Sequence, residues 1–238
     1  MSTPVPPPGP TAKTTYTLAV CLFHHFTTLD YQGPIEILTA YSTSNRKNYG
    51  FLFETFPDSA IDAEFLSHSM EPVEPGIGPK VLPTGTYKDV MEQGRQFDII
   101  LIPGGAGNPG NVDSSLLEFI KTQYPKAKHI LTVCTGSWIL AGTGLLSGKK
   151  ATTNKKVFRM IEEFTKDLNI TWVPKARWVV TDDNKIWTSS GITAGMDLAN
   201  AFMEYFVGEE FAYEACKIAE LTPKGEGEDE WAAVHGLV

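Results

Sequence analysis

Several features that mark other classes of protein are scarce in this chain of 238 residues. It has only three cysteines, Cys21, Cys134 and Cys216, which are odd in number and far apart, so they suggest no disulfide framework. No apolar run approaches the ~18 residues that a membrane span needs. Residues 1–10 have neither the basic nor the apolar region of a secretory signal. We therefore expect a cytoplasmic protein with no membrane partner.

Positive charge is also in deficit. The 20 lysines and arginines are outnumbered by 28 aspartates and glutamates, which gives a formal net charge of -8. Surfaces that bind nucleic acid or anionic lipid favour basic patches, so this balance argues against a nucleic-acid partner. Histidine, cysteine and carboxylate residues show no metal-ligand spacing, and we expect no bound metal.

The glycine-rich run at residues 103–110 lacks the companions of a nucleotide site. Gly105, Gly107 and Gly110 satisfy the pattern G-x-G-x-x-G, but no carboxylate ends the next strand ~20 positions later. A Gly-Lys-Ser/Thr sequence is missing as well, which excludes a P-loop. We expect instead that Gly104 and Gly105 present backbone N–H groups as an oxyanion-type hole, with a flexible turn as the alternative.

What the chain does contain is an alternation of short apolar strands with helices. The pattern predicts strands at 16–23, 51–56, 97–102 and 129–133, helices at 34–41, 113–124, 135–142, 152–166 and 194–207, and a hairpin at 178–188. Residues 57–86 are expected to be loop-rich, with a short hairpin as an alternative. This order predicts an α/β fold whose parallel sheet is covered on both faces. We expect one domain over 14–220, a disordered tail over 1–13 and a solvated, acidic tail over 221–238.

Cys134 directly follows the apolar strand at 129–133 and directly precedes a helix. In parallel sheets, chemistry gathers at this end of the strands. The helix N-terminus offers N–H groups and a positive dipole end, and Gly136 allows a sharp turn. We expect this turn to lower the pKa of the thiol and project the sulfur into solvent, as in the nucleophile elbow of hydrolases. The alternative is a buried cysteine that only packs, as expected for Cys21.

A cysteine nucleophile needs a proton donor or acceptor within reach. Asp30 follows the first strand and its loop, which places it on the same sheet edge as Cys134. Its alternative role is the N-cap of the following helix. His24 and His25 also follow the first strand, whereas His129 lies at the wrong end of its strand. No histidine spacing demands a catalytic pair.

A series of motifs carries a family resemblance. They are LDYQGPIE at 29–36, LIPGG at 101–105, VCTGS at 133–137, KATTN at 150–154 and SSGITAGMD at 189–197. Over about residues 16–207 the chain resembles the ThiJ/PfpI superfamily, also described as class-I glutamine-amidotransferase-like, and most closely its isonitrile hydratase branch. The resemblance implies a flavodoxin-like three-layer α/β sandwich with a mostly parallel central sheet, a homodimer, and no metal or organic cofactor.

The resemblance also assigns roles to individual residues. Cys134 matches the nucleophile, and Asp30 matches the carboxylate beside the sulfur. Thr135, directly after the nucleophile, matches the residue found there in the hydratase branch. Peptidase-like members have His where Thr135 stands, so a protease would lack its base. Asn154 stands where many relatives have His, and Asn cannot titrate. Asn154 and Tyr31 are expected close behind the residues that contact substrate.

The function that the resemblance implies is a cofactor-independent hydratase or lyase. It would add water to a small electrophilic substrate, such as an isonitrile, through a covalent thioimidate on Cys134. Thr135, Gly104, Gly105 and Gly136 would orient the substrate. Two alternatives stay open, namely a glyoxalase-type enzyme acting on 2-oxoaldehydes and a non-catalytic redox sensor or stress protein whose thiolate oxidises to a sulfinic acid.

Overall fold

A seven-stranded sheet forms the centre of the computed structural model, which describes residues 8–238. The strand order is β3-β2-β1-β4-β5-β9-β8, with β8 antiparallel to β9 and the other pairs parallel. The strands are β1 (Thr14–Cys21), β2 (Ser59–Ser67), β3 (Gly85–Thr86), β4 (Ile99–Ile102), β5 (His129–Thr132), β8 (Trp178–Thr181) and β9 (Ile186–Ser189), and a separate pair is formed by β6 (Lys150–Ala151) and β7 (Thr171–Trp172). The predicted hairpin is confirmed as β8 and β9.

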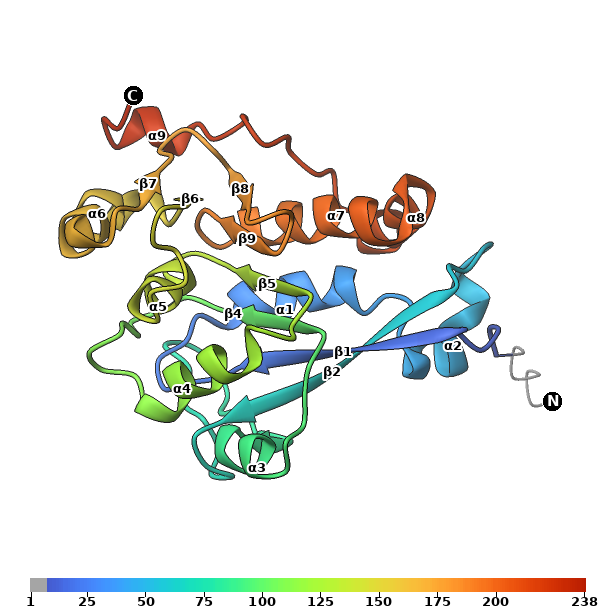
Figure 1. Cartoon of the computed structure of the whole chain (residues 1–238). Coiled ribbons are helices and arrows are strands. Elements are labelled where there is room, and N and C mark those ends of the chain that lie inside the picture. Colours follow the sequence, from blue (N-terminus) through green and yellow to red (C-terminus); the bar gives the residue numbers. More distant parts are fainter. Residues whose placement is uncertain (1–7) are drawn as a thin grey trace.

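Helices cover both faces of this sheet (Figure 1). α1, α7 and α8 pack together in one layer, and α3, α4 and α5 form the other. The helices are α1 (Thr28–Leu38), α2 (Thr43–Tyr49), α3 (Tyr87–Glu92), α4 (Ser114–Gln123), α5 (Gly136–Gly142), α6 (Phe158–Phe164), α7 (Ala194–Val207), α8 (Glu209–Ala219) and α9 (Trp231–Val234), with short 3-10 turns η1 (Gly50–Leu52), η2 (Lys155–Val157) and η3 (Lys166–Leu168). The predicted α/β fold with a mostly parallel central sheet is confirmed.

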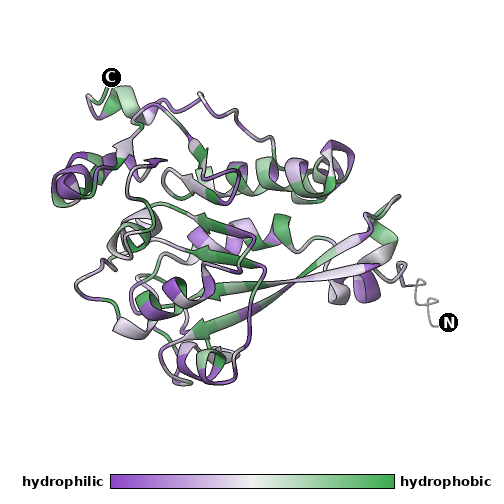
Figure 2. Cartoon of the chain, in the orientation of Figure 1, coloured by the Kyte–Doolittle hydropathy of each residue, from purple (hydrophilic) through white to green (hydrophobic). Residues whose placement is uncertain are grey.

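Apolar residues fill the centre of the sheet. All four residues of β4, and all four of β5, are buried, because helices cover both of their faces. Figure 2 shows these strands in the colours of hydrophobic residues, while the helices alternate between hydrophobic and hydrophilic faces. Within residues 8–238, no helix has the length and apolar character required to cross a membrane.

The second strand was placed wrongly from the sequence. Residues 51–56 form the end of η1 and a loop, and the rings of Phe53 and Phe56 lie 4.6 and 6.0 Å from that of Tyr41. These apolar side chains pack in an aromatic cluster with Tyr41 and not in the sheet. The strand is β2, inside the stretch expected to be loop-rich, where it pairs in parallel with β1.

Both predicted tails contain residues that contact the domain. Of the tail expected at 1–13, residues 1–7 lie outside the described residues, and the N–H of Gly9 donates to the carbonyl oxygen of Arg46 at 2.7 Å. The solvated tail expected at the C-terminus is wrong at Asp229, which is buried against Lys155. The domain limits at residues 14 and 220 stay predictions.

Candidate active site

Several segments meet at one edge of the sheet because the carboxyl ends of parallel strands share that edge. Asp30 follows β1, Gly104 follows β4, Cys134 follows β5 and Ile192 follows β9. Asn154, after β6, reaches the same place. A cavity of about 770 Å³ opens here, and Cys134, Asn154 and Ile192 form part of its wall.

The predicted sharp turn is present at Cys134. Its φ angle is +58°, in the left-handed region that a residue with a side chain rarely adopts. Hydrogen bonds hold it there: its N–H donates to Ser190 O at 3.0 Å, and its carbonyl oxygen accepts from Ser137 Oγ at 3.1 Å and Thr153 Oγ1 at 3.0 Å. A Cβ at Gly136 would lie 2.2 Å from the last carbonyl oxygen of β4, so the turn requires glycine there.

The sulfur of Cys134 is not projected into solvent. The residue is only 6% exposed. Burial, and then the charge of Asp30, raise the pKa of the thiol to about 12, while hydrogen bonds from Asn154 and from the backbone N–H groups of Thr135 and Ile192 lower it. The prediction of an exposed thiol with a lowered pKa is therefore wrong, because desolvation outweighs these donors. This thiol therefore holds its proton more tightly than an exposed cysteine does.

Asp30 lies in the first turn of α1 and is fully buried. Thr27 occupies the N-cap position, so Asp30 is not the helix cap. Its Oδ2 accepts from the N–H of Gly104 at 3.0 Å. Burial raises the pKa of this carboxyl to about 7, and Gly104 and the Cys134 thiol act in the opposite direction. Over residues 8–238, Oδ1 receives no hydrogen bond of normal geometry. Asp30 can therefore gain or lose a proton near neutral pH.

Asn154 contacts the sulfur directly, closer than the sequence suggested. Its Nδ2 lies 3.2 Å from Sγ of Cys134, and its Oδ1 accepts from the N–H of Lys156 at 2.9 Å. This second bond fixes the orientation of the amide, since an oxygen must face the Lys156 donor. An amide can stabilise negative charge on sulfur, but it cannot accept the thiol proton.

The predicted oxyanion hole does not match the hydrogen bonds of the glycine loop. The N–H of Gly104 is bound to Asp30, and that of Gly105 donates to Thr135 Oγ1 at 2.9 Å. The Thr135 hydroxyl in turn donates to the carbonyl oxygen of Gly105 at 2.9 Å. Both N–H groups are thus already used within the protein. The role of Gly104 is close approach, because a Cβ there would lie 2.6 Å from the backbone nitrogen of Thr135.

Ile192 is a site residue that sequence reasoning missed. Its backbone N–H faces the Cys134 sulfur, and its φ angle of +35° is unusual for a β-branched residue. The motif at 189–197 marked this loop without assigning it a role. The N–H groups of Thr135 and Ile192 are the backbone donors to the sulfur, in place of those predicted for the glycines.

Other candidate residues lie at or beyond the edge of the site. The Tyr31 ring packs in the core, 5.4 Å from the ring of Phe26 and 5.9 Å from that of Phe65. His25 lines the cavity, whereas Nδ1 of His24 accepts from the N–H of Glu74 at 3.3 Å. Across the part of the chain that the structure describes, no three His, Cys, Asp or Glu residues are grouped so that they could hold a metal ion.

The fold and the site define an α/β protein with a cysteine elbow beside a buried carboxyl. The family model described as DJ-1/PfpI family matches residues 17–205, and the chain belongs to this family. The predicted family resemblance is confirmed.

Named relatives differ in activity. An isonitrile hydratase of Pseudomonas putida is 31% identical over 192 residues, which cover 80% of this chain and 72% of that protein. The glutathione-independent glyoxalase DJR-1.2 of Caenorhabditis elegans is 32% identical over 84 residues, which cover 35% of this chain and 44% of that protein. A crystal structure of a ThiJ/PfpI family protein from Pseudomonas syringae has a TM-score of 0.69 and 23% identity, and the match covers 89% of this chain and 77% of that chain.

Proposed function

We propose that this protein is a cofactor-independent hydratase that adds water to a small isonitrile through a covalent bond to Cys134. The observation that carries the proposal is the set of groups at the sulfur: one buried carboxyl, Asp30, that can exchange a proton near neutral pH, and an amide, Asn154, that cannot. The similarity to the Pseudomonas putida isonitrile hydratase supports the same chemistry.

In the first step, the Cys134 thiol adds across the terminal carbon of the isonitrile, R–N≡C. Asp30 accepts the thiol proton while the sulfur forms its bond to carbon, and then delivers that proton to the same carbon. The product is the thioimidate R–N=CH–S–Cys134. A pKa of about 7 suits Asp30 to both halves of this transfer, because general acid–base catalysis works best near the operating pH.

In the second step, water adds to the thioimidate carbon. Asp30 takes one proton from the water, the nitrogen receives a proton, and the adduct R–NH–CH(OH)–S–Cys134 forms. The C–S bond then breaks, the hydroxyl proton is lost as the carbonyl forms, and the sulfur regains a proton. The products are the formamide R–NH–CHO and the free thiol. Donors from Asn154, Thr135 and Ile192 stabilise the charge that develops on the leaving sulfur.

The two alternatives receive less support. Isomerising a 2-oxoaldehyde moves protons between two carbons and favours a second base, but Asn154 stands at the sulfur where a histidine would act. A redox sensor needs an accessible thiolate, whereas burial raises the pKa of the Cys134 thiol. We keep the homodimer as a prediction that light scattering on the purified chain tests.

The test is turnover of an isonitrile panel with formamide detection, together with intact mass spectrometry of trapped enzyme. We expect the parent protein to carry a mass increase equal to the isonitrile, and Cys134→Ala to lose turnover by at least about 10³-fold. Cys216→Ala is the matched control, because Cys216 is buried in α8, donates to Asn200 Oδ1 and does not line the cavity at Cys134. Conversion of methylglyoxal to lactate, with no isonitrile turnover, would overturn the proposal in favour of a glyoxalase.

A further inference from the structure

The C-terminal segment, residues 223–238, is fastened back onto the domain at several points. The N–H of Lys224 donates to Asp197 Oδ1 at 2.8 Å, and the carbonyl oxygen of Glu226 accepts from the N–H of Arg177 at 2.6 Å. Near its end, the carbonyl oxygen of Gly236 accepts from the Arg159 guanidinium. This segment lies outside residues 17–205, the range matched by the family model.

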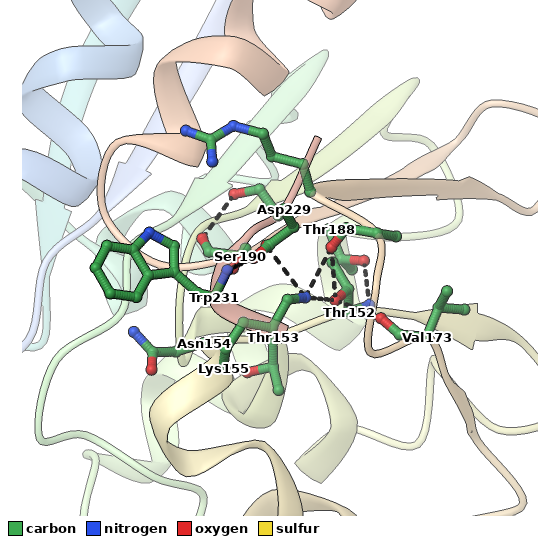
Figure 3. Close-up of polar contacts among 12 residues, drawn as sticks. Thr152, Thr153, Asn154, Lys155, Val173, Thr188, Ser190, Asp229 and Trp231 are labelled. Carbon is green, nitrogen blue, oxygen red and sulfur yellow. Dashed lines mark hydrogen bonds and ion pairs between the residues drawn. The ribbon is translucent and has the colours of Figure 1, made fainter. Parts of the chain in front are cut away.

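An ion pair at the centre of this segment is fully buried. Lys155 Nζ lies 3.6 Å from Asp229 Oδ2, and their side chains are 2% and 0% exposed. Figure 3 shows Lys155 pointing toward Asp229 and Thr152, and its ammonium donates to Thr152 Oγ1 at 2.6 Å. The other oxygen of Asp229, Oδ1, accepts from the N–H of Trp231 at 3.0 Å. At 3.6 Å the pair is an electrostatic contact, and over residues 8–238 Asp229 Oδ2 has no hydrogen bond of normal geometry. Removing one partner would leave a buried, uncompensated charge, so the two segments depend on each other.

The chain segment that Asp229 holds is the one that supplies the amide at the sulfur. Lys155 directly follows Asn154, whose Nδ2 contacts Cys134 Sγ at 3.2 Å. One residue earlier, Thr153 Oγ1 donates to the carbonyl oxygen of Cys134 at 3.0 Å. Movement of Lys155 therefore moves Asn154 relative to the nucleophile. Trp231, from the C-terminal segment, and Asn154 both line a hollow of about 260 Å³.

We propose that residues 223–238 act as a strap in which Asp229, through Lys155, is a positioning residue that holds the Asn154 amide against the Cys134 sulfur. The inference rests on Cys134 being the reactive group of the proposed function, but not on the identity of its substrate. It gives this C-terminal segment a role in the chemistry of the thiol.

The experiment measures the rate of Cys134 alkylation by iodoacetamide as a function of pH in the full chain, with the site of alkylation assigned by peptide mass mapping. Asp229→Asn keeps the size of the side chain and removes its charge. We expect the whole profile to shift to lower rates, by about tenfold at pH 8, because a loosened Asn154 stabilises the thiolate less. Asn154→Ala should show the same shift, and the double variant should show little more than either single one.

A matched control separates positioning from general loss of stability. Arg46 is also buried and donates to the carbonyl oxygens of Tyr41 and Pro57, at the opposite edge of the sheet from Cys134. Arg46→Gln should lower the melting temperature and leave the alkylation profile unchanged. If Asp229→Asn also leaves the profile unchanged, or if its effect adds fully to that of Asn154→Ala, the proposal is overturned.

Should Asp229→Asn fail to fold, the combined variant Lys155→Met with Asp229→Leu decides the question. Replacing a buried ion pair with apolar groups is often neutral for stability, so this variant keeps the packing but loses the pair. A shifted alkylation profile supports the strap, and the parent profile overturns it. Because iodoacetamide is not the substrate, a protein with no isonitrile turnover but a shifted profile refutes the proposed function alone.

Discussion

Two kinds of buried carboxylate occur in this protein. Asp197 is paired with Arg177, whose Nε lies 2.6 Å from Oδ2, and Asp229 is paired with Lys155. Asp30 is equally buried, but among residues 8–238 no lysine or arginine forms an ion pair with it. Asp197 and Asp229 each lie beside a cation, whereas burial without one raises the pKa of Asp30 to about 7. The difference separates carboxylates that fasten the fold from one that can move a proton.

The largest effect should come from removing the proton-exchanging carboxyl. Asp30→Asn should lower kcat/KM for an isonitrile by about 10²–10⁴-fold, because the amide cannot take the thiol proton. The parent protein should show kcat/KM rising with pH to a plateau above about pH 7, as Asp30 loses its proton. Steady-state kinetics from pH 5 to 9 measure both effects. If Asp30→Asn keeps some activity and its kcat/KM still falls below about pH 7, another group causes that fall.

Neutralising Asp197, which is paired with Arg177, should cause a large loss of stability and only a small loss of activity. Asp197→Asn should lower the free energy of unfolding by about 3–5 kcal/mol, because it leaves Arg177 buried without its counter-charge. Urea denaturation with matched m-values measures this change. We expect kcat/KM of the folded fraction to fall less than tenfold. The comparison fails if Asp30→Asn destabilises the protein as much as Asp197→Asn does.

Stability should depend on pH through Asp30 in a defined direction. Its pKa is raised from 3.8 to about 7 by burial, so the folded state binds this proton more tightly than the unfolded state between these values. The contribution is present below about pH 4 and is lost as pH rises to about 7. Asp30→Asn has no such proton, so its stability relative to the parent should increase over this window and stay level above it. Denaturation curves at pH 4.5, 6, 7 and 8 measure the difference, and a constant difference would rule out a raised pKa.

The meeting of Cys134 and Asp30 at the carboxyl edge of the sheet was predictable from the sequence. The burial of the Cys134 sulfur at that edge was not. Cys134 and Asp30 each follow a strand of a parallel sheet, and topology alone brings such ends together. Desolvation of the Cys134 sulfur depends on how loops from β6 and β9 close over it, and no local pattern states this. The motif at 189–197 contains Ile192 but gave no sign of its role. The role depends on a backbone N–H in a strained conformation, which does not depend on the type of side chain.

Long-range contacts also account for the two segments whose structure was predicted wrongly, residues 51–56 and the C-terminal segment. The aromatic run at 51–56 has the composition of a strand, yet tertiary packing with Tyr41 overrides that propensity. The acidic, glycine-containing C-terminal segment has the composition of a solvated tail. A single long-range partner, Lys155, is what buries Asp229, and composition contains no information about such a partner.

The smallest effect concerns the glycine that lets Asp30 approach the elbow. A Cβ at Gly104 would lie 2.8 Å from Asp30 Oδ2 and 2.8 Å from the Cβ of Cys134. Gly104→Ala should therefore cost about 1–3 kcal/mol of stability and separate the carboxyl from the thiol. At Gly227 no heavy atom of the described residues lies within 4 Å of an added Cβ, and Gly227→Ala should stay within about 0.5 kcal/mol of the parent. If Gly104→Ala retains the parent's stability and its pH limb near 7, the close contact between Asp30 and the elbow is not what makes this carboxyl different from Asp197 and Asp229.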